Sequence, residues 1–301
     1  MKFKKRALGP ILLLALGLAI SIPLALELRK NRSVSYYNAG INILRTDIKS
    51  ALDYFQVLAE TGDETAISGF AWAQFRAGKY EIANGLADLL ITESANIRIK
   101  ARSLYLKGSI AAQEHKTKRS VAFFNQAKNA YGQIDNRSGV YRSNISMATL
   151  LMLSGDNLLA GEIVENLKIP NGENPGSYFR IKATLAFRRS SYVEAAELND
   201  KAISSFTDNQ NLLALFQTLT DRAFQLAWLG NVQSATEFMR MANDLNVESK
   251  KESAYQKIVQ ILCKIKKNEP YKSLIEEVQI YSDETGDMAI MISLNSVINS
   301  N

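Results

Sequence analysis

Residues 155–170, "GDNLLAGEIVENLKIP", contain the pattern that decides the fold. Ala160 in this stretch follows Ala148 by twelve positions, and a Gly-Asp pair lies between the two alanines. Glycine is typical of a helix end, and aspartate can cap the next helix. Val164 and Leu167 follow Ala160 at +4 and +7, on the same helix face. The stretch therefore predicts two helices that cross closely at a pair of small residues.

The same spacing occurs seven times along the chain. The pairs are Ala39/Ala51, Ala71/Ala83, Gly108/Ser120, Ala148/Ala160, Ala183/Ala195, Ala223/Ala235 and, with larger residues, Leu262/Leu274. Turn signals between the members of the pairs are Thr46-Asp47, Gly78-Lys79, Gly155-Asp156, Ser190-Ser191 and Gly230-Asn231. The corresponding units begin at Arg32, Glu64, Ala101, Tyr141, Gly176, Phe216 and Tyr255. A small-residue pair that recurs in this way predicts an array of helical hairpins.

The pattern resembles the tetratricopeptide repeat over residues 32 to about 285. The segments "GDNLLAGEIVENLKIP" (155–170), "GKYEIANGLADLL" (78–90) and "GNVQSATEFMRMANDL" (230–245) carry the resemblance best. It implies an all-α fold, a right-handed superhelix (α-solenoid) of about seven helix-turn-helix repeats. The leucines of the seventh unit favour a splayed or capping pair, followed by a terminal helix over Met288 to Ile298. A generic array of helical hairpins is the alternative.

The N-terminal segment predicts a membrane anchor. Residues 7–26 form a 20-residue run without a charge, preceded by four basic residues. Twenty helical residues extend about 30 Å, the thickness of a bilayer's hydrocarbon core. We therefore expect residues 1–6 to be a cytoplasmic tail, residues 7–26 a transmembrane helix, and residues 27–301 the solenoid body. A cleaved signal peptide is the alternative, although no good cleavage motif precedes the charges that follow the run.

The charge distribution argues against nucleic acid as a partner. The chain has a net charge of +6, but seven of its 36 basic residues and one of its 30 acidic residues lie within residues 1–32. The rest of the chain therefore contains 29 of each sign and is neutral. Global attraction to a polyanion has no support in the body. Positive charges before the apolar run favour an N-terminus in the cytoplasm.

The residue inventory predicts that the protein is not an enzyme. His115 is the single histidine and Cys263 the single cysteine. A catalytic triad, a two-histidine metal motif and a cysteine zinc site are therefore disfavoured or impossible. Glycine-rich phosphate-binding motifs are also absent from the sequence. We expect no cofactor and no metal.

The resemblance to tetratricopeptide repeats also implies where a partner would bind. In that family the first helix of each pair lines an inner groove. The matching positions of this sequence are Tyr36, Trp72, Phe75, Arg76, Arg102, Tyr105, Arg142, Met152, Arg180, Phe187, Arg188, Phe224 and Trp228. Aromatic residues and arginines are enriched at interface hot spots. Arg102, Arg142 and Arg180, on successive units, could form a ladder for an acidic or C-terminal carboxylate group, or each could pair with a neighbouring acid.

These features predict a membrane-anchored scaffold for protein–protein interactions. The layout is similar to tetratricopeptide proteins of pilus, secretion or translocon assembly. We expect a single-pass protein of the inner (cytoplasmic) membrane of a bacterium, with its body in the periplasm. One alternative is a regulatory receptor whose solenoid senses a ligand or peptide. Another is an adaptor that faces the cytoplasm.

Overall fold

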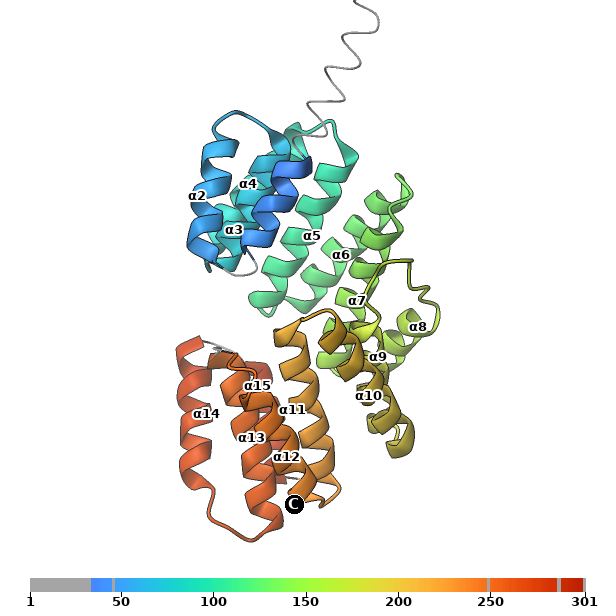
Figure 1. The fold of residues 1–301 in the computed structure, drawn as a ribbon, viewed down its shortest axis with the longest axis vertical. Coiled ribbons are helices and arrows are strands. Elements are labelled where there is room, and N and C mark those ends of the chain that lie inside the picture. Colours follow the sequence, from blue (N-terminus) through green and yellow to red (C-terminus); the bar gives the residue numbers. More distant parts are fainter. Residues whose placement is uncertain (1–33, 45–46, 248–249, 286–287, 300–301) are drawn as a thin grey trace, which may run out of the picture. The chain divides into compact units, whose positions relative to one another are not determined.

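The computed structural model describes residues 34–44, 47–247, 250–285 and 288–299. These residues form α-helices joined by turns and loops, with no strand among them (Figure 1). The prediction of an all-α fold is confirmed. The predicted tail and transmembrane segment, residues 1–26, lie outside the described part. None of the helices in the described part is both long and apolar enough to cross a membrane.

The chain divides into two compact units, with the boundary inside α5 between Ile110 and Ala111. Unit 1 contains a helix at residues 34–44, α2 (Ile48–Ala59), α3 (Glu64–Arg76), α4 (Tyr80–Glu93) and most of α5 (Ile97–Gln113). Unit 2 contains the end of α5, α6 (Thr117–Gly132), α7 (Arg137–Leu153), α8 (Asn157–Glu165), α9 (Gly176–Arg188), α10 (Tyr192–Asp208), α11 (Leu212–Trp228), α12 (Val232–Asn243), α13 (Lys250–Lys266), α14 (Lys272–Thr285) and α15 (Met288–Asn299). The predicted solenoid body covers both units.

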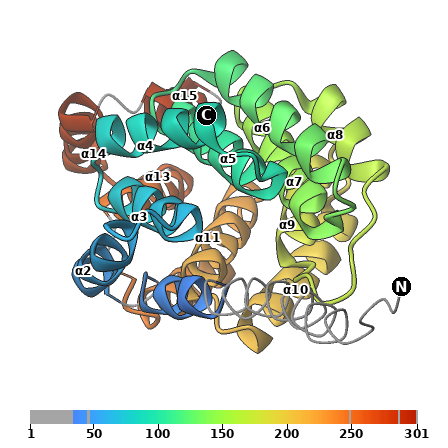
Figure 2. The same ribbon diagram turned by 90° about the horizontal axis from the view of Figure 1, so that it is seen from above.

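Helices that follow one another in sequence pack against one another within each unit. In unit 1, α3 packs against α2 and α4 (Figure 2), and in unit 2, α9 packs against α10 and α11 against α12. Helix α15 packs against α13 and α14, as expected for the predicted terminal helix. Its buried residues are Ile290, Leu294 and Val297, which belong to the largest apolar core cluster of the chain's described part.

The turns inside six of the helix pairs, from α3–α4 to α13–α14, close with the same two hydrogen bonds. In the α7–α8 turn, Gly155 N–H donates to the Met152 carbonyl and Asp156 N–H donates to the Leu151 carbonyl. The residue at the first of these positions has a left-handed backbone, as in a Schellman motif. The corresponding residues and φ angles are Gly78 (76°), His115 (57°), Gly155 (90°), Ser190 (63°), Gly230 (83°) and Asn268 (56°). The turn geometry is therefore repeated even where glycine is replaced.

The small residues of the predicted pairs lie at the helix crossings. Those that are buried are Ala51, Ala71, Ala83, Gly108, Ser120, Ala148, Ala160, Ala183, Ala195, Ala223 and Ala235. Burial of short side chains allows two helix axes to approach closely. The predicted seventh pair differs, because Leu262 is buried and Leu274 is half-buried.

The prediction for Ala39 is wrong. Ala39 is exposed, and Gly40 is the buried small residue of the first helix. A Cβ atom at Gly40 would overlap the ring of Phe55, and a Cβ atom at Gly69 would overlap the same ring from α3. Phe55 is fully buried between these two glycines. The twelve-residue spacing is displaced by one position here because the aromatic ring of α2 requires a neighbour without a side chain.

Candidate functional site: the aromatic and arginine side chains of the first helices

Three of the predicted groove residues, Trp72, Phe75 and Tyr105, come together in unit 1 with a fourth ring, Tyr80. The Trp72 ring lies 5.6 Å from the Phe75 ring and 6.0 Å from the Tyr105 ring, between ring centroids. Phe75 also contacts Tyr80, at a centroid distance of 5.7 Å. All four rings are half-buried, so each packs on the core and keeps part of its surface in water. The contacts join α3 to α5 and to the first turn of α4.

Arg102 extends this cluster from α5. Its guanidinium carbon lies 4.2 Å above the centre of the Tyr37 ring, a cation–π contact with the helix at residues 34–44. Arg102 and Tyr105 are three residues apart on one helix face, as Trp72 and Arg76 are four apart on α3. Arg76 is exposed at the end of α3. We call Trp72, Phe75, Arg76, Arg102 and Tyr105 the aromatic–arginine surface.

Helix α3 is held in place by polar contacts at its N-terminus. The Asp63 carboxylate accepts hydrogen bonds from the Thr65 and Ala66 amides and so caps the helix. The Ser94 hydroxyl donates to the Glu64 carboxylate at 2.6 Å, which ties the start of α3 to the loop before α5. These contacts fix the relative position of the two helices that carry the surface.

Helix α5 is also tied to α4. Lys107, which is buried, forms an ion pair with Asp88. Among the described residues of unit 1, however, no carboxylate lies within ion-pair distance of Arg102 or Arg76. The guanidinium groups of the aromatic–arginine surface are therefore not neutralised by this part of the chain.

Tyr36, the remaining predicted residue of unit 1, does not join this cluster. Its side chain is 47% exposed, and its backbone carbonyl accepts a hydrogen bond from the Tyr54 hydroxyl. The neighbouring Tyr37 makes the contact with Arg102 instead. Tyr37 and Tyr80 were not among the residues predicted from the sequence, although Tyr80 directly follows the predicted Gly78-Lys79 turn.

Two of the three predicted arginines of unit 2, Arg142 and Arg180, have carboxylate partners within the chain. Arg142 Nε and Nη2 donate to the two carboxylate oxygens of Glu173, at 3.2 and 2.8 Å. Arg180 Nε donates to Asp221 at 2.7 Å, and its Nη1 donates to Gln217 at 2.6 Å. These contacts follow the alternative in which each arginine pairs with a neighbouring acid.

The Arg180 contact continues through a chain of side chains that links three helices. Gln217 accepts from Arg180 and donates through Nε2 to the Glu252 carboxylate at 2.6 Å. Arg180 lies on α9, Gln217 and Asp221 on α11, and Glu252 on α13. We call these four residues the polar brace of unit 2.

Arg188, at the end of α9, binds the turn between α7 and α8. Its Nη1 donates to the Met152 carbonyl at 2.6 Å and to the Asn157 side-chain oxygen at 2.5 Å. Desolvation lowers the pKa of its guanidinium group, and the negative charge of Asp221 opposes this shift. The side chain therefore gives the Met152 carbonyl, which also accepts from Gly155 N–H, a second donor at the end of α7.

The predicted aromatic residues of unit 2 pack against their own hairpins. The Phe187 ring lies 5.4 Å from the Tyr192 ring across the α9–α10 turn. The Phe224 and Trp228 rings, one turn apart on α11, lie 5.9 Å apart with an interplanar angle of 30°. Both α11 rings are half-buried against the core cluster that includes α15. Each of these rings therefore packs against its own helical hairpin and keeps part of its surface exposed to water.

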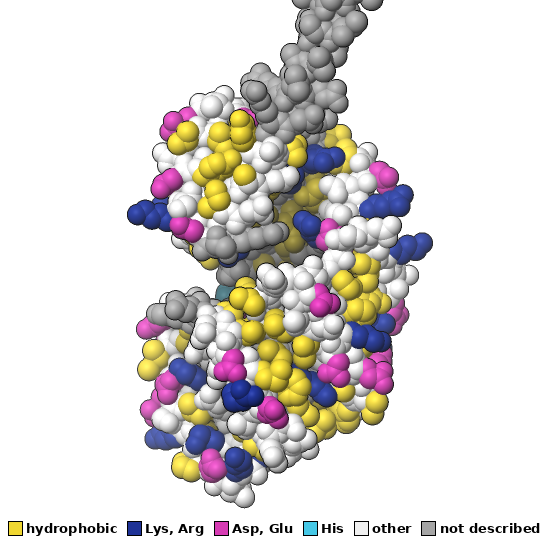
Figure 3. All heavy atoms as spheres, viewed as in Figure 1, with side chains coloured by type: hydrophobic (Ala, Val, Ile, Leu, Met, Phe, Trp, Pro, Cys, Tyr) yellow, Lys and Arg dark blue, Asp and Glu magenta, His cyan; other side chains and the backbone are white. Residues whose placement is uncertain are grey.

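Charged side chains do not gather by sign on the face shown in Figure 3. Lysine and arginine side chains alternate with aspartate and glutamate over both units on that face. No family model matches the chain, and no curated protein gave a significant match.

Proposed function

We propose that this chain is a membrane-anchored scaffold that binds other proteins through an α-solenoid of the tetratricopeptide kind. The aromatic–arginine surface of unit 1 is the observation that carries the proposal. Tryptophan, tyrosine and arginine are the types most often found at interface hot spots, where an amphipathic side chain gives up water at low entropic loss. The partner segment would insert an apolar side chain between the rings of Trp72, Phe75 and Tyr105.

The arginines indicate the charge of the partner. Arg102 and Arg76 flank the rings and have no carboxylate partner in the described part of unit 1. An acidic side chain or a C-terminal carboxylate of the partner would supply one, in a charge-assisted hydrogen bond. We therefore propose that the partner segment carries an apolar residue next to an acidic group.

The repeated helix pairs support the solenoid. Six pairs close with the same turn, and five consecutive pairs from Ala71/Ala83 to Ala223/Ala235 bury a small residue at both predicted crossing positions. In a tetratricopeptide-like array, the first helices of the pairs face the inner groove. The proposed partner surface lies on two of these first helices, α3 and α5.

The membrane attachment and the location rest on the sequence. The apolar run at residues 7–26 supports a single-pass anchor in the inner membrane. The basic residues before it support export of the body to the periplasm. There the scaffold would assist the assembly or regulation of envelope complexes of the pilus, secretion or translocon type.

Photo-crosslinking in cells tests the partner surface. A photoreactive amino acid at Phe75 should capture a specific set of proteins. The matched control is Leu89, an exposed apolar residue on α4 outside the surface. Capture should fall when Arg102 is replaced by Gln and persist when Arg98, an exposed arginine one turn earlier on α5, is replaced by Gln. Equal capture from Phe75 and Leu89 would contradict the proposal.

A reporter fused after Asn301 tests the location separately. Activity of a reporter that functions only in the periplasm is the expected result, and activity of a cytoplasm-specific reporter would exclude the periplasmic assignment.

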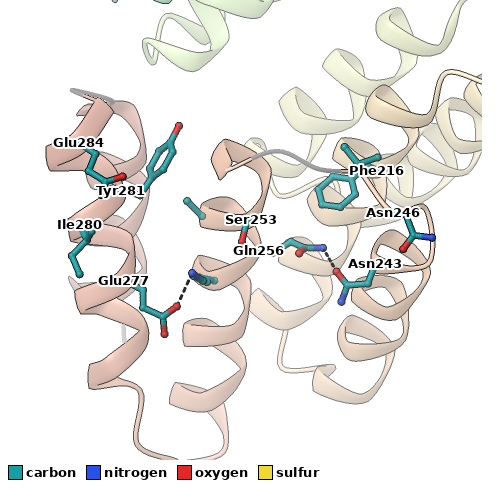
Figure 4. Close-up of a pocket in the computed structure, with 12 residues that line it drawn as sticks. Phe216, Asn243, Asn246, Ser253, Gln256, Glu277, Ile280, Tyr281 and Glu284 are labelled. Carbon is teal, nitrogen blue, oxygen red and sulfur yellow. Dashed lines mark hydrogen bonds and ion pairs between the residues drawn. The ribbon is translucent and has the colours of Figure 1, made fainter. Parts of the chain in front are cut away.

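The second candidate function is a receptor that senses a ligand or peptide. A pocket between α12 and α14 favours it (Figure 4).

A further inference from the structure

The helices of unit 2 are connected at two opposite ends. Consecutive helices from α6 to α15 pack against each other, so they run antiparallel and their connections alternate between the two ends. The turns inside the helix pairs lie at one end, as Figure 1 shows for the α11–α12 and α13–α14 turns. We define the turn edge as the residues within four positions of the left-handed turn residues of these pairs. Those turn residues are His115, Gly155, Ser190, Gly230 and Asn268.

The turn edge is basic. Its five segments contain nine lysine or arginine residues and four aspartate or glutamate residues, a net charge of +5. Four loops at the opposite end, counted in the same way around Asp135, Gly172, Gln210 and Asn246, contain three basic and four acidic residues among those described. Unit 2 therefore has its excess of cations at one end only.

The acids of the turn edge do not cancel this charge. Glu114 pairs with Lys116 at 3.0 Å, and Glu269 pairs with Lys264 at 3.6 Å. The Asp156 carboxylate accepts from the Leu159 amide and so caps α8. Exposed cations remain at three of the turns. Among the described residues, no carboxylate lies within ion-pair distance of Lys118, Arg189, Lys267 or Lys272.

The turn edge also exposes apolar side chains. Leu158 and Val193 lie three residues after the left-handed residue of successive turns, and they are 84% and 75% exposed. Arg188 at the end of α9 donates to the Asn157 side-chain oxygen, so it links the α9 end of its hairpin to the turn that carries Leu158. Further exposed apolar residues of the edge are Leu153, Leu159, Tyr192 and Leu229. Large apolar side chains gain free energy when they leave water, so this edge favours a partner that covers them.

The mixture of cations and apolar side chains fits the surface of an anionic bilayer. Apolar groups of a peripheral protein enter the boundary between headgroups and acyl chains, while lysine and arginine attract anionic lipids. A tyrosine such as Tyr192, which is 39% exposed, is typical of this boundary because its ring is apolar and its hydroxyl is polar. A bilayer can also receive each turn separately, whereas a protein partner would need a surface shaped to several turns.

We propose that the turn edge of unit 2 docks on the surface of an anionic bilayer. Leu158 and Val193 enter the boundary between headgroups and acyl chains. Arg189, Lys267 and Lys272 bind lipid phosphates. The docking uses neither the aromatic–arginine surface nor the apolar run at residues 7–26, so it does not depend on the function proposed above.

Site-specific fluorescence quenching in vesicles tests the docking. The full chain with Cys263→Ala carries one bimane label, at Leu158→Cys or at Val193→Cys. It is reconstituted into phosphatidylcholine vesicles with nitroxide-labelled lipid, either without or with an equal part of phosphatidylglycerol. Both labels should be quenched in the anionic vesicles and not in the neutral ones. The matched control is a label at Leu212→Cys, an exposed leucine at the opposite end of unit 2, which should not be quenched in either.

Paired substitutions measure the contribution of the cations. Lys267→Gln combined with Lys272→Gln should lower the ratio of quenched to unquenched label at Val193→Cys by about 25-fold, since each cation near an anionic membrane contributes about fivefold. Arg137→Gln combined with Lys168→Gln removes two exposed cations from the opposite end and should leave this ratio unchanged.

A label at Ala15→Cys reports insertion of the predicted anchor separately. Quenching of the edge labels without quenching at Ala15→Cys would support the docking and count against the anchor. Edge labels that stay unquenched in anionic vesicles overturn the docking and leave the edge to an acidic protein partner. Equal quenching at Leu212→Cys, equal quenching in neutral vesicles, or an equal effect of the two substitution pairs would overturn it as well.

Discussion

Arginines of the first helices have different surroundings in the two units. In unit 1, Arg102 lies over the Tyr37 ring, and no carboxylate of the unit's described residues neutralises it. In unit 2, Arg180 is bound by Asp221 and Gln217, and Arg142 is bound by Glu173. The same residue type on the same class of helix is therefore bound by carboxylates of its own unit in unit 2 and lies over an aromatic ring in unit 1, where we propose that it binds a partner. The neighbouring side chains decide which role applies.

The largest expected effect tests whether the two units unfold independently of each other. Phe55→Ala removes a fully buried ring from unit 1 and should lower the free energy of unfolding by about 3–5 kcal/mol. Amide hydrogen exchange should increase in α2 and α3 and remain slow in α9 to α12, since locally cooperative segments open independently. Phe206→Ala, a buried ring of unit 2, should give the reverse pattern. Equal loss of protection in both units for either variant would show that they unfold together.

The stability of unit 2 should depend on pH at high pH through the Tyr141 side chain. Burial, followed by Glu173 and then Tyr178, raises the pKa of Tyr141 to about 12. The folded state thus holds this proton more tightly than the unfolded state, where the ordinary pKa is about 10. Stability from Tyr141 is therefore fully present below pH 10 and is lost as the pH rises toward 12, by about 2–3 kcal/mol.

Denaturant unfolding of the Tyr141→Phe variant isolates this effect from other titrating groups. The variant also loses the hydrogen bond from the Tyr141 hydroxyl to the Asn174 carbonyl, so it should be less stable by about 1 kcal/mol near pH 8. The difference between variant and parent should shrink above pH 10. A difference that stays constant to pH 12 would mean that Tyr141 titrates normally.

The polar brace should matter more for stability than the arginine of unit 1. Arg180→Ala leaves Asp221 and Gln217 without a hydrogen-bond donor, and we expect a loss of about 1–2 kcal/mol. Arg102→Ala should lose about 0.5–1 kcal/mol, the range for a partly exposed cation–π contact. Arg142→Ala, whose side chain is 65% exposed, should lose less than about 1 kcal/mol. Thermal unfolding of the three variants ranks them, and a larger loss for Arg102 than for Arg180 would reverse the comparison.

The smallest expected effect is the change in melting temperature when residues at the left-handed turn positions are replaced. Unit 1 has Gly78 in its left-handed turn position, whereas unit 2 has His115 and Ser190 at two equivalent positions. A side chain there is sterically disfavoured, by about 1 kcal/mol. His115→Gly and Ser190→Gly should therefore each raise the melting temperature slightly, while Gly155→Ala should lower it. Unchanged melting temperatures would mean that the local geometry relaxes without strain.

Local features of the fold were predictable from the sequence. The turns at Gly78, Gly155, Ser190 and Gly230 and the terminal helix follow from glycine placement, capping and apolar spacing within about 20 residues. The prediction that Ala39 lies at the first helix crossing was wrong, because the spacing alone does not show that Phe55 needs Gly40 as its neighbour.

Distant features of the site were not predictable. The aromatic and arginine positions were identified from the repeat register. Their partners were not, because Asp221 lies 41 residues after Arg180 and Glu173 lies 31 after Arg142. The α14 pocket was also missed, since only the packing of four helices creates it.

A single quantitative crosslinking experiment tests the central claim, that the aromatic–arginine surface of unit 1 binds the partner. The photoreactive residue is kept at Phe75, and captured protein is measured for the parent, Arg102→Gln and Arg180→Gln at a temperature where all three are folded. We predict that Arg102→Gln reduces capture by about tenfold, the loss of one charged contact, and that Arg180→Gln retains it despite its lower stability. Retained capture with Arg102→Gln together with lost capture with Arg180→Gln would contradict the account.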